Sequence, residues 1–154
     1  MGKKLTIGDI IEIATSKGLC YAYYTHEHRT YGSLIRVYPG FNEVRPKDVQ
    51  SLVCGDPKFI CFCSISKSIR DGKFFIVGNA ELNGDAKVFP TFRAGMKSPA
   101  TDKVENWWFW DGNNEWRVGN ITNEQRKMPL RGVWNEKLLL LRIVSEWTPQ
   151  NDPL

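Results

Sequence analysis

The sequence predicts a mostly β fold of the α+β class: a strongly bent antiparallel sheet or a small SH3-like barrel, with two or three short helices. Short segments rich in β-branched and aromatic residues recur between turn signals, whereas helix signals are few and brief. The 154 residues are the length of one domain, large enough to bury a core of its own. We therefore expect a single domain over 1–154, with its core at about 5–147 and a loose, Pro-containing tail at 148–154.

The first half of the chain contains most of the expected strands. The near-continuous apolar run at 59–65 is typical of a central strand buried on both faces, and 74–77 is interpreted in the same way. Turn residues separate the others. The expected strands are 7–14, 19–25, 31–38, 59–65 and 74–77.

Two short helices are expected from capping signals. Ser66 can cap a helix that runs to Arg70 before Gly72, and Thr122–Gln125 fits a capping box that opens a second one, limited by Pro129. Between them, 80–103 is either a long loop or a short edge strand.

The segment 135–146 fits two structures. Asn135 can cap a helix, and Trp134, Leu138, Leu141 and Ser145 fall on one helical face. The unbroken apolar centre would also suit a strand. We predict the helix.

Four aromatic rings follow one another at 107–110, and the turn signal Asp111-Gly112 follows them, so a hairpin with a return arm at 115–118 is expected. Alternating side chains make both faces of the first arm aromatic. We expect Trp108 and Phe109 in the core, and leave Trp107 and Trp116 open between core and surface. The candidate partner-binding residues are Trp107, Trp110, Asp111, Glu115, Trp116 and Arg117.

No set of residues in the sequence indicates catalysis, so no catalytic residues and no cofactor are expected. His26 and His28 have a spacing that could serve a metal on a strand, but they lie between two expected strands, which favours a solvated hairpin tip. The cysteines Cys20, Cys54, Cys61 and Cys63 are expected to be reduced and mostly buried.

Composition indicates a cytoplasmic protein without a membrane segment. The longest apolar run, 138–141, is far too short to span a bilayer, and no signal-peptide pattern is present. The net charge of +4 comes from scattered basic residues, which makes nucleic acid possible as a partner without favouring it.

The order of these features resembles the bacterial immunity protein 26 family of polymorphic toxin systems. The resemblance covers about residues 5–147 and depends on the segments 7–13, 21–24, 32–37, 59–65, 75–79, 90–93 and 107–112. It implies a cytoplasmic protein that binds and neutralises a cognate toxin by stoichiometric contact, without catalysis. Immunity proteins against nucleases are often acidic, so the positive net charge implies a toxin that is not strongly basic or an acidic patch around Glu105, Asp111 and Glu115.

Two alternatives remain open. The Gly-Asp-Ile opening is similar to that of small-barrel plasmid-maintenance toxins, which suggests an RNA-binding protein or endoribonuclease, although the Arg-Pro pair expected soon after that opening is missing. A metal-dependent enzyme would have to use His26 and His28. The identity of the toxin and the oligomeric state do not follow from the sequence.

Overall fold

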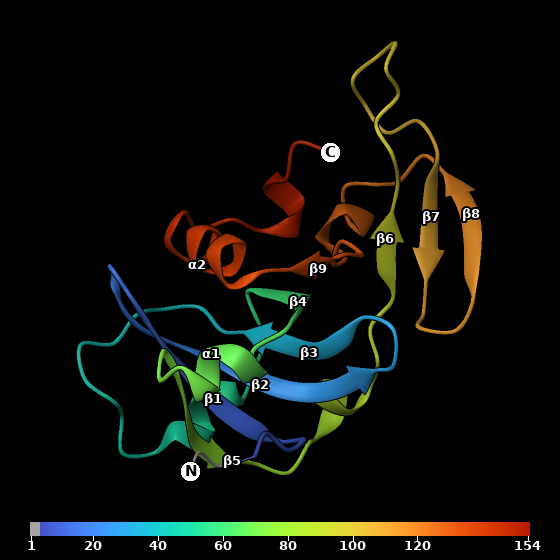
Figure 1. Ribbon diagram of the computed structural model, residues 1–154. Helices are drawn as coiled ribbons and strands as arrows, with labels where there is room; N and C mark the ends of the chain where they lie inside the picture. Colours follow the sequence, from blue (N-terminus) through green and yellow to red (C-terminus); the bar gives the residue numbers. More distant parts are fainter. Residues whose placement is uncertain (1–3) are drawn as a thin grey trace.

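The computed structural model describes residues 4–154 and contains two sheets, with helical segments packed around them (Figure 1). The main sheet has six strands in the order β5-β1-β2-β3-β4-β9, and the second sheet has three in the order β6-β7-β8. Pairing is antiparallel except between β4 and β9. The strands are β1 Asp9–Thr15, β2 Gly18–His28, β3 Gly32–Val37, β4 Phe59–Cys63, β5 Phe74–Asn79, β6 Phe92–Ala94, β7 Trp107–Trp110, β8 Glu115–Gly119 and β9 Val133–Trp134. This confirms the mostly β fold class, as open sheets and not as a closed barrel.

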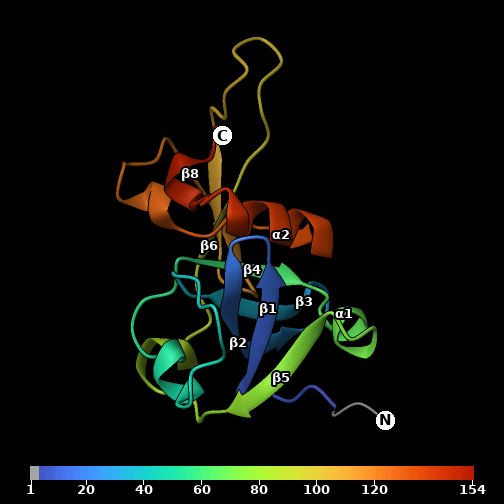
Figure 2. The same cartoon turned by 90° about the vertical axis from the view of Figure 1, so that its left-hand side faces the viewer.

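One face of the main sheet is covered by the helix α2 (Glu136–Val144), which lies across it in Figure 2. Cross-strand pairing aligns Ile11, Ala22, Val37 and Phe59 on this face. Leu139 and Ile143 of α2 are buried against the same core, one helical turn apart. The side chains of this core stabilise the packing of helix on sheet at roughly 25 cal/mol for each Å² of apolar surface removed from water.

The opposite face of the main sheet is covered in two parts. Its row of paired residues is Ile10, Tyr23, Arg36 and Ile60. The short 3₁₀ helices η1 (Val49–Val53) and η2 (Gly84–Lys87) and their flanks cover one part, while the second sheet covers the part around Leu34 and Phe62. Burial on both faces explains why β4 is apolar at almost every position.

Aromatic rings join the two sheets. Phe62 of β4 stacks on Phe92 of β6, with ring centroids 5.1 Å apart and planes 17° from parallel. Tyr31, in the β2–β3 turn, packs on Trp110 of β7 at 4.8 Å. Such contacts contribute about 0.5–1.5 kcal/mol per pair beyond the burial of their area.

Arg93 of β6 ties the second sheet to the C-terminal residues. It is fully buried, and its Nη2 donates a hydrogen bond of 2.6 Å to the carbonyl of Pro149. Its guanidinium lies 4.7 Å from the ring centroid of Trp107. Burial, more than any neighbouring charge, lowers the pKa of Arg93 to about 10.

The C-terminal residues 148–154 are not the loose tail that we expected. Pro149–Asn151 form a 3₁₀ helix, η4, that opens with a capping box between Thr148 and Asn151. Asp152 is buried and accepts a hydrogen bond of 2.9 Å from the indole Nε1 of Trp147. The expectation was wrong because composition alone carries no sign of these partners, which lie in β6 and just after α2.

Three more predicted elements, two helices and one strand, are present in the structure. The helix α1 spans Ser66–Arg70 as predicted, but Ser66 is its first residue and not its cap, because Ile65 holds the N-cap position without a side-chain hydrogen bond. The predicted capping box of Thr122 and Gln125 is present before the 3₁₀ helix η3 (Gln125–Lys127). The strand at 74–77 is present, but β5 lies at the edge of the main sheet and not at its centre.

The segment 135–146 is the predicted helix, and the Oδ1 of its cap Asn135 accepts a 2.8 Å hydrogen bond from the N–H of Leu138. Its inward face was assigned wrongly. Leu139 and Ile143 are buried, whereas 59% of Leu141 is exposed. The predicted face, which began at Trp134, assumed a helix that includes this residue, but Trp134 belongs to β9.

Candidate functional site

The hairpin of β7 and β8 is closed by a turn whose residues have local structural roles. The Oδ1 of Asp111 accepts hydrogen bonds from the N–H groups of Asn113 (3.0 Å) and Asn114 (2.8 Å), and these bonds lower the pKa of the carboxyl. Gly112 has a φ of +100°, and a Cβ there would lie 2.8 Å from the ring of Phe89. Asp111 therefore acts as a turn residue, as its position before a glycine suggested.

The four rings of β7 divide unevenly between core and surface. Trp107, Phe109 and Trp110 are buried, whereas 39% of Trp108 is exposed. The expectation that Trp108 lies in the core was wrong. It is paired with the small Ala94 of β6, and no bulky neighbour on that strand covers it; Trp110 is paired with Phe92 and reaches the junction of the two sheets.

Two exposed tryptophans lie on opposite faces of the hairpin. Register pairs Trp108 with Arg117 and Phe109 with Trp116, and neighbouring positions along a strand point to opposite faces. Trp116 is 42% exposed and touches only Phe109 among the aromatic contacts of residues 4–154. A molecule bound along the outer strand, β8, would meet Trp116 on one face and, on the other face, Arg117 with Trp108 next to it on β7.

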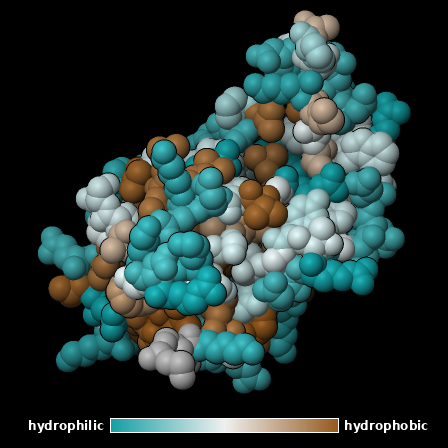
Figure 3. Space-filling model, viewed as in Figure 1, coloured by the Kyte–Doolittle hydropathy of each residue, from teal (hydrophilic) through white to brown (hydrophobic). Residues whose placement is uncertain are grey.

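The outer edge of β8 faces away from the protein. It is the last strand of the second sheet and lies farthest from the main sheet in Figure 1. In Figure 3 the same side of the molecule is mostly teal and white, with little of the brown that marks apolar residues. An edge strand exposes alternate N–H and C=O groups that can pair with another strand.

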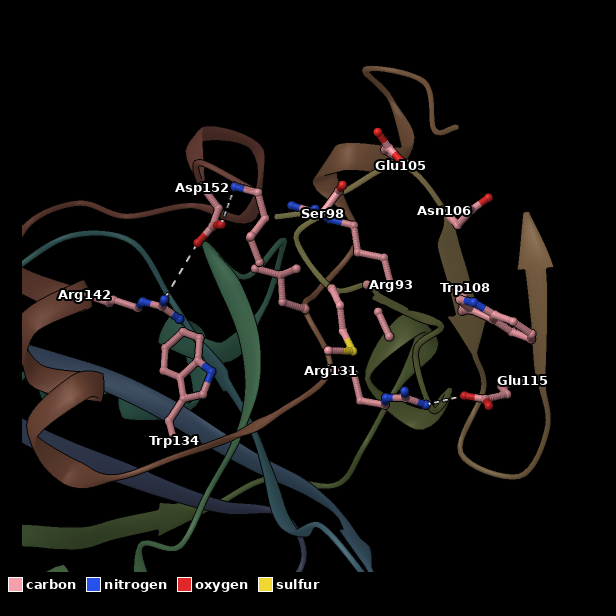
Figure 4. Close-up of a pocket in the computed structure, with 15 residues that line it drawn as sticks. Arg93, Ser98, Glu105, Asn106, Trp108, Glu115, Arg131, Trp134, Arg142 and Asp152 are labelled. Carbon is pink, nitrogen blue, oxygen red and sulfur yellow. Dashed lines mark hydrogen bonds and ion pairs between the residues drawn. The ribbon is translucent and has the colours of Figure 1, made fainter. Parts of the chain in front are cut away.

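A cavity of about 680 Å³ lies between the hairpin and the C-terminal segment (Figure 4). Four of its charged groups form two ion pairs: the Nη1 of Arg131 is 2.7 Å from the Oε2 of Glu115, and Arg142 lies 3.7 Å from Asp152. Arg93 and Glu105 also line the cavity and belong to no ion pair in residues 4–154. The guanidinium of Arg142 also lies near two rings that are nearly perpendicular to each other, 4.5 Å from the ring centroid of Trp134 and 4.4 Å from that of Trp147. Balanced charge and exposed aromatic edges suit contact with protein side chains of both signs.

The structure separates the six candidate partner-binding residues into two groups. Glu115, Trp116 and Arg117 are exposed on β8, and the Nε of Arg117 donates a hydrogen bond of 3.1 Å to the Oδ1 of Asn106. Trp107 and Trp110 are buried, and Asp111 closes the turn. Trp108 and Arg131 also border the cavity, although sequence reasoning did not select them as binding residues. Nothing local in the sequence marks Arg131 as a residue of the cavity. For Trp108, the one available signal of exposure was the small size of its partner on β6, Ala94.

His26 and His28 bond to the backbone and lie on β2, which extends to His28; they are not at a hairpin tip. The Nε2 of His26 is 3.0 Å from the carbonyl oxygen of Lys87. The Nδ1 of His28 accepts from the N–H of Tyr31, which leaves its Nε2 to donate to the carbonyl of Gly112 at 2.9 Å. Within residues 4–154, no three His, Cys, Asp or Glu side chains are grouped to hold a metal ion.

Three of the four cysteines are buried, as expected, and all four are free thiols. Burial raises the pKa of Cys20 to about 11 and that of Cys63 to about 12, so these thiols stay protonated at neutral pH. Cys54, by contrast, is exposed.

The chain matches no protein-family model, no curated protein and no solved structure. Across residues 4–154, neither α-helix has the length and apolar character needed to cross a bilayer.

Proposed function

We propose that this protein binds and neutralises a cognate bacterial toxin protein by stoichiometric contact, without catalysis. The contact would be made by the hairpin surface, which consists of Trp108, Glu115, Trp116 and Arg117. One observation carries the proposal: the hairpin that ends in the free edge strand β8 exposes a tryptophan on each of its faces, Trp116 on β8 and Trp108 on the adjacent strand β7. Tryptophan and arginine concentrate binding energy at protein interfaces. The resemblance to the immunity protein 26 family is what suggests a toxin as the partner.

The geometry favours a partner that adds a strand to β8. Main-chain hydrogen bonds to the open edge would supply part of the affinity. Trp116 would pack beside the added strand on one face of the sheet, and Arg117, with Trp108 behind it on β7, would lie beside it on the other face. The Glu115–Arg131 ion pair beside them presents both charges, so the partner need not be strongly basic. This fits the overall net charge of +4 better than phosphate mimicry does.

Co-expression with the toxin encoded by a neighbouring gene tests the proposal. The protein should restore growth and co-purify with the toxin in a stoichiometric complex. Trp116→Ala and Trp108→Ala should each weaken the complex about 30-fold or more, as expected for interface positions worth about 2 kcal/mol. The matched control is Phe75→Ala, which removes a ring that is 46% exposed on the edge strand β5 of the main sheet, and it should leave the affinity unchanged.

The proposal is overturned if the wild-type protein gives no protection and forms no complex with the toxin. The leading alternative is RNA binding, because rings beside Arg117 could stack on unpaired bases. A titration with single-stranded RNA at several salt concentrations distinguishes them. Saturable binding that falls steeply with salt, without any protein complex, would assign the same surface to RNA.

A further inference from the structure

A second cavity, of about 830 Å³, lies over the main sheet between the η1 and η2 segments, and the hairpin surface takes no part in it. Its lining includes Tyr23 and Arg36, which belong to the row of paired residues on this face of the main sheet, and Tyr38, which follows the end of β3. Apolar neighbours from both 3₁₀ segments complete the lining, for example Val53 and Ala86. Apolar walls with a few convergent polar groups are typical of small-molecule sites.

Arg36 is a buried cation without a counter-ion. Only 4% of it is exposed, and it forms no ion pair in the part of the chain that the structure describes. Its Nε donates to the Oγ1 of Thr25 (3.3 Å) and its Nη2 to the carbonyl of Val88 (2.9 Å), while its Nη1 has no partner within residues 4–154. Burial lowers the pKa of this guanidinium. The Nη1 of Arg36 is not among the enclosed side-chain atoms without a partner in residues 4–154, so a molecule in the cavity can reach it. A bound anion would supply the counter-ion that this largely buried cation lacks.

Tyr38 adds a second unpaired donor to the same cavity. It is 6% exposed and lies two residues beyond Arg36, on the same face. The hydroxyls of Tyr21, Tyr23 and Tyr24 each bond to a carboxylate or a carbonyl, but that of Tyr38 has no partner in residues 4–154. Burial raises the pKa of Tyr38 to about 12, so its hydroxyl keeps a proton to donate at neutral pH.

The rim of this cavity has the opposite charge. Asp56, Glu81 and Asp85 line it and are exposed. Exposed carboxylates are screened by water and salt, whereas the guanidinium at the base acts at low dielectric. The base therefore determines which group enters, and the rim favours a ligand whose outer part is cationic.

We propose that this cavity binds the carboxylate of an amino acid or short peptide. The carboxylate accepts hydrogen bonds from the Nη1 of Arg36 and the hydroxyl of Tyr38, and the amino group lies toward the rim carboxylates. A free amino acid and the C-terminal end of a peptide supply the same chemistry. This site is independent of the toxin-binding proposal, because it shares no residue with the hairpin surface.

Cys54 provides a native reporter for occupancy. It lines the cavity and is exposed, whereas the other three cysteines are buried. A thiol-reactive dye should therefore label Cys54 first. Bound ligand should slow this labelling in a saturable way, and titration calorimetry on the unlabelled protein should give the same affinity.

The probes are glycine, L-alanine, the dipeptide Ala-Ala, its C-terminal amide, acetate and inorganic phosphate. Saturation by the amino acids or the dipeptide, with acetate much weaker and the amide inactive, supports the proposal. Tighter binding of the dipeptide identifies the peptide end as the source, and equal or tighter binding of the amino acids identifies the free molecule. Saturation by phosphate alone, or by no probe, overturns the proposal.

Three variants test whether Arg36 and Tyr38 bind the carboxylate of the ligand. Tyr38→Phe removes one hydroxyl and should weaken binding about tenfold. Tyr24→Phe, the same change on the opposite face of the sheet, should leave binding as in wild type. Arg36→Gln should abolish binding; if it fails to fold, Tyr38→Phe alone decides. Unchanged affinity in Tyr38→Phe would overturn the proposal.

Discussion

The two sheets use similar aromatic-rich strands in different ways. In the main sheet, strands such as β3 and β4 are covered on both faces, so rings such as Phe59 and Phe62 are core. In the second sheet, β6 and β7 are partly covered, but β8 has no neighbour on its outer side and Trp116 remains exposed. Coverage by other segments, and not the composition of the strand, decides whether a ring acts as core or as surface. Four predictions follow from this difference, ordered by the size of their expected effect.

The largest effect is expected where the two sheets meet. Phe62→Ala removes a fully buried ring that contacts both sheets, and should lower the free energy of unfolding by about 3–5 kcal/mol. Chemical denaturation measures this. Phe75→Ala, on the exposed edge of the main sheet, should cost less than about 1 kcal/mol. If both variants lose the same free energy of unfolding, the two rings are buried to the same extent, and the comparison between core and edge is wrong.

The link from the second sheet to the C-terminal segment should have the next largest effect. Arg93→Met leaves the carbonyl of Pro149 without its donor and removes the contact with Trp107, at a cost of about 2–3 kcal/mol. Hydrogen exchange should show faster exchange around η4, while β1 to β4 keep their protection. Arg93→Lys keeps the charge but loses the forked geometry, so it should recover only part of the stability. Uniform loss of protection across both sheets would contradict this localised role.

Acid should lower the free energy of unfolding through His26 of β2. Burial lowers the pKa of His26, so the folded protein holds this ring neutral at pH values where the unfolded chain protonates it. The contribution of His26 to the free energy of unfolding is fully present above the ordinary histidine pKa of about 6.5 and decreases as the pH falls below that value. Thermal unfolding at about pH 7.5 and about pH 5.5, one unit on either side of that pKa, measures this loss of stability. His26→Gln should flatten the dependence, and an unchanged slope would assign it to other groups.

The smallest effect on stability is expected on the hairpin surface. Trp116→Ala should change the free energy of unfolding by no more than about 0.5 kcal/mol, because its side chain is 42% exposed and lies on an edge strand, with Phe109 as its one aromatic contact in residues 4–154. The same denaturation series measures it. A loss comparable to that of Phe62→Ala would make Trp116 part of the core and remove it from the proposed interface.

Sequence reasoning located most elements because their signals are local. An apolar run marked β4, and capping side chains marked α2 and η3 at or near their observed bounds. The bounds of α1 were found although its predicted cap, Ser66, does not act as one. These signals depend on residues within a few positions of each other. The position of β5 at a sheet edge is set by the order of strands, which no local pattern carries.

The candidate site was harder to predict for the same reason. Trp108 and Trp110 occupy equivalent faces of one strand, yet only Trp110 reaches Phe62 and Phe92. Arg36 and Tyr38 were recognised only as parts of a strand. Their unpaired donors become visible when η1 and η2, distant in the chain, are placed beside them.

The short parallel pairing of β4 with β9 has a consequence for synthesis on the ribosome. The core under α2 includes Trp134, Leu139 and Ile143, while most of its other members come from the first 74 residues. A growing chain therefore presents an uncovered apolar sheet face from about residue 74 until Ile143 has been made. At about 5–20 residues per second, that interval lasts several seconds. We expect the nascent chain to depend on chaperones during this interval.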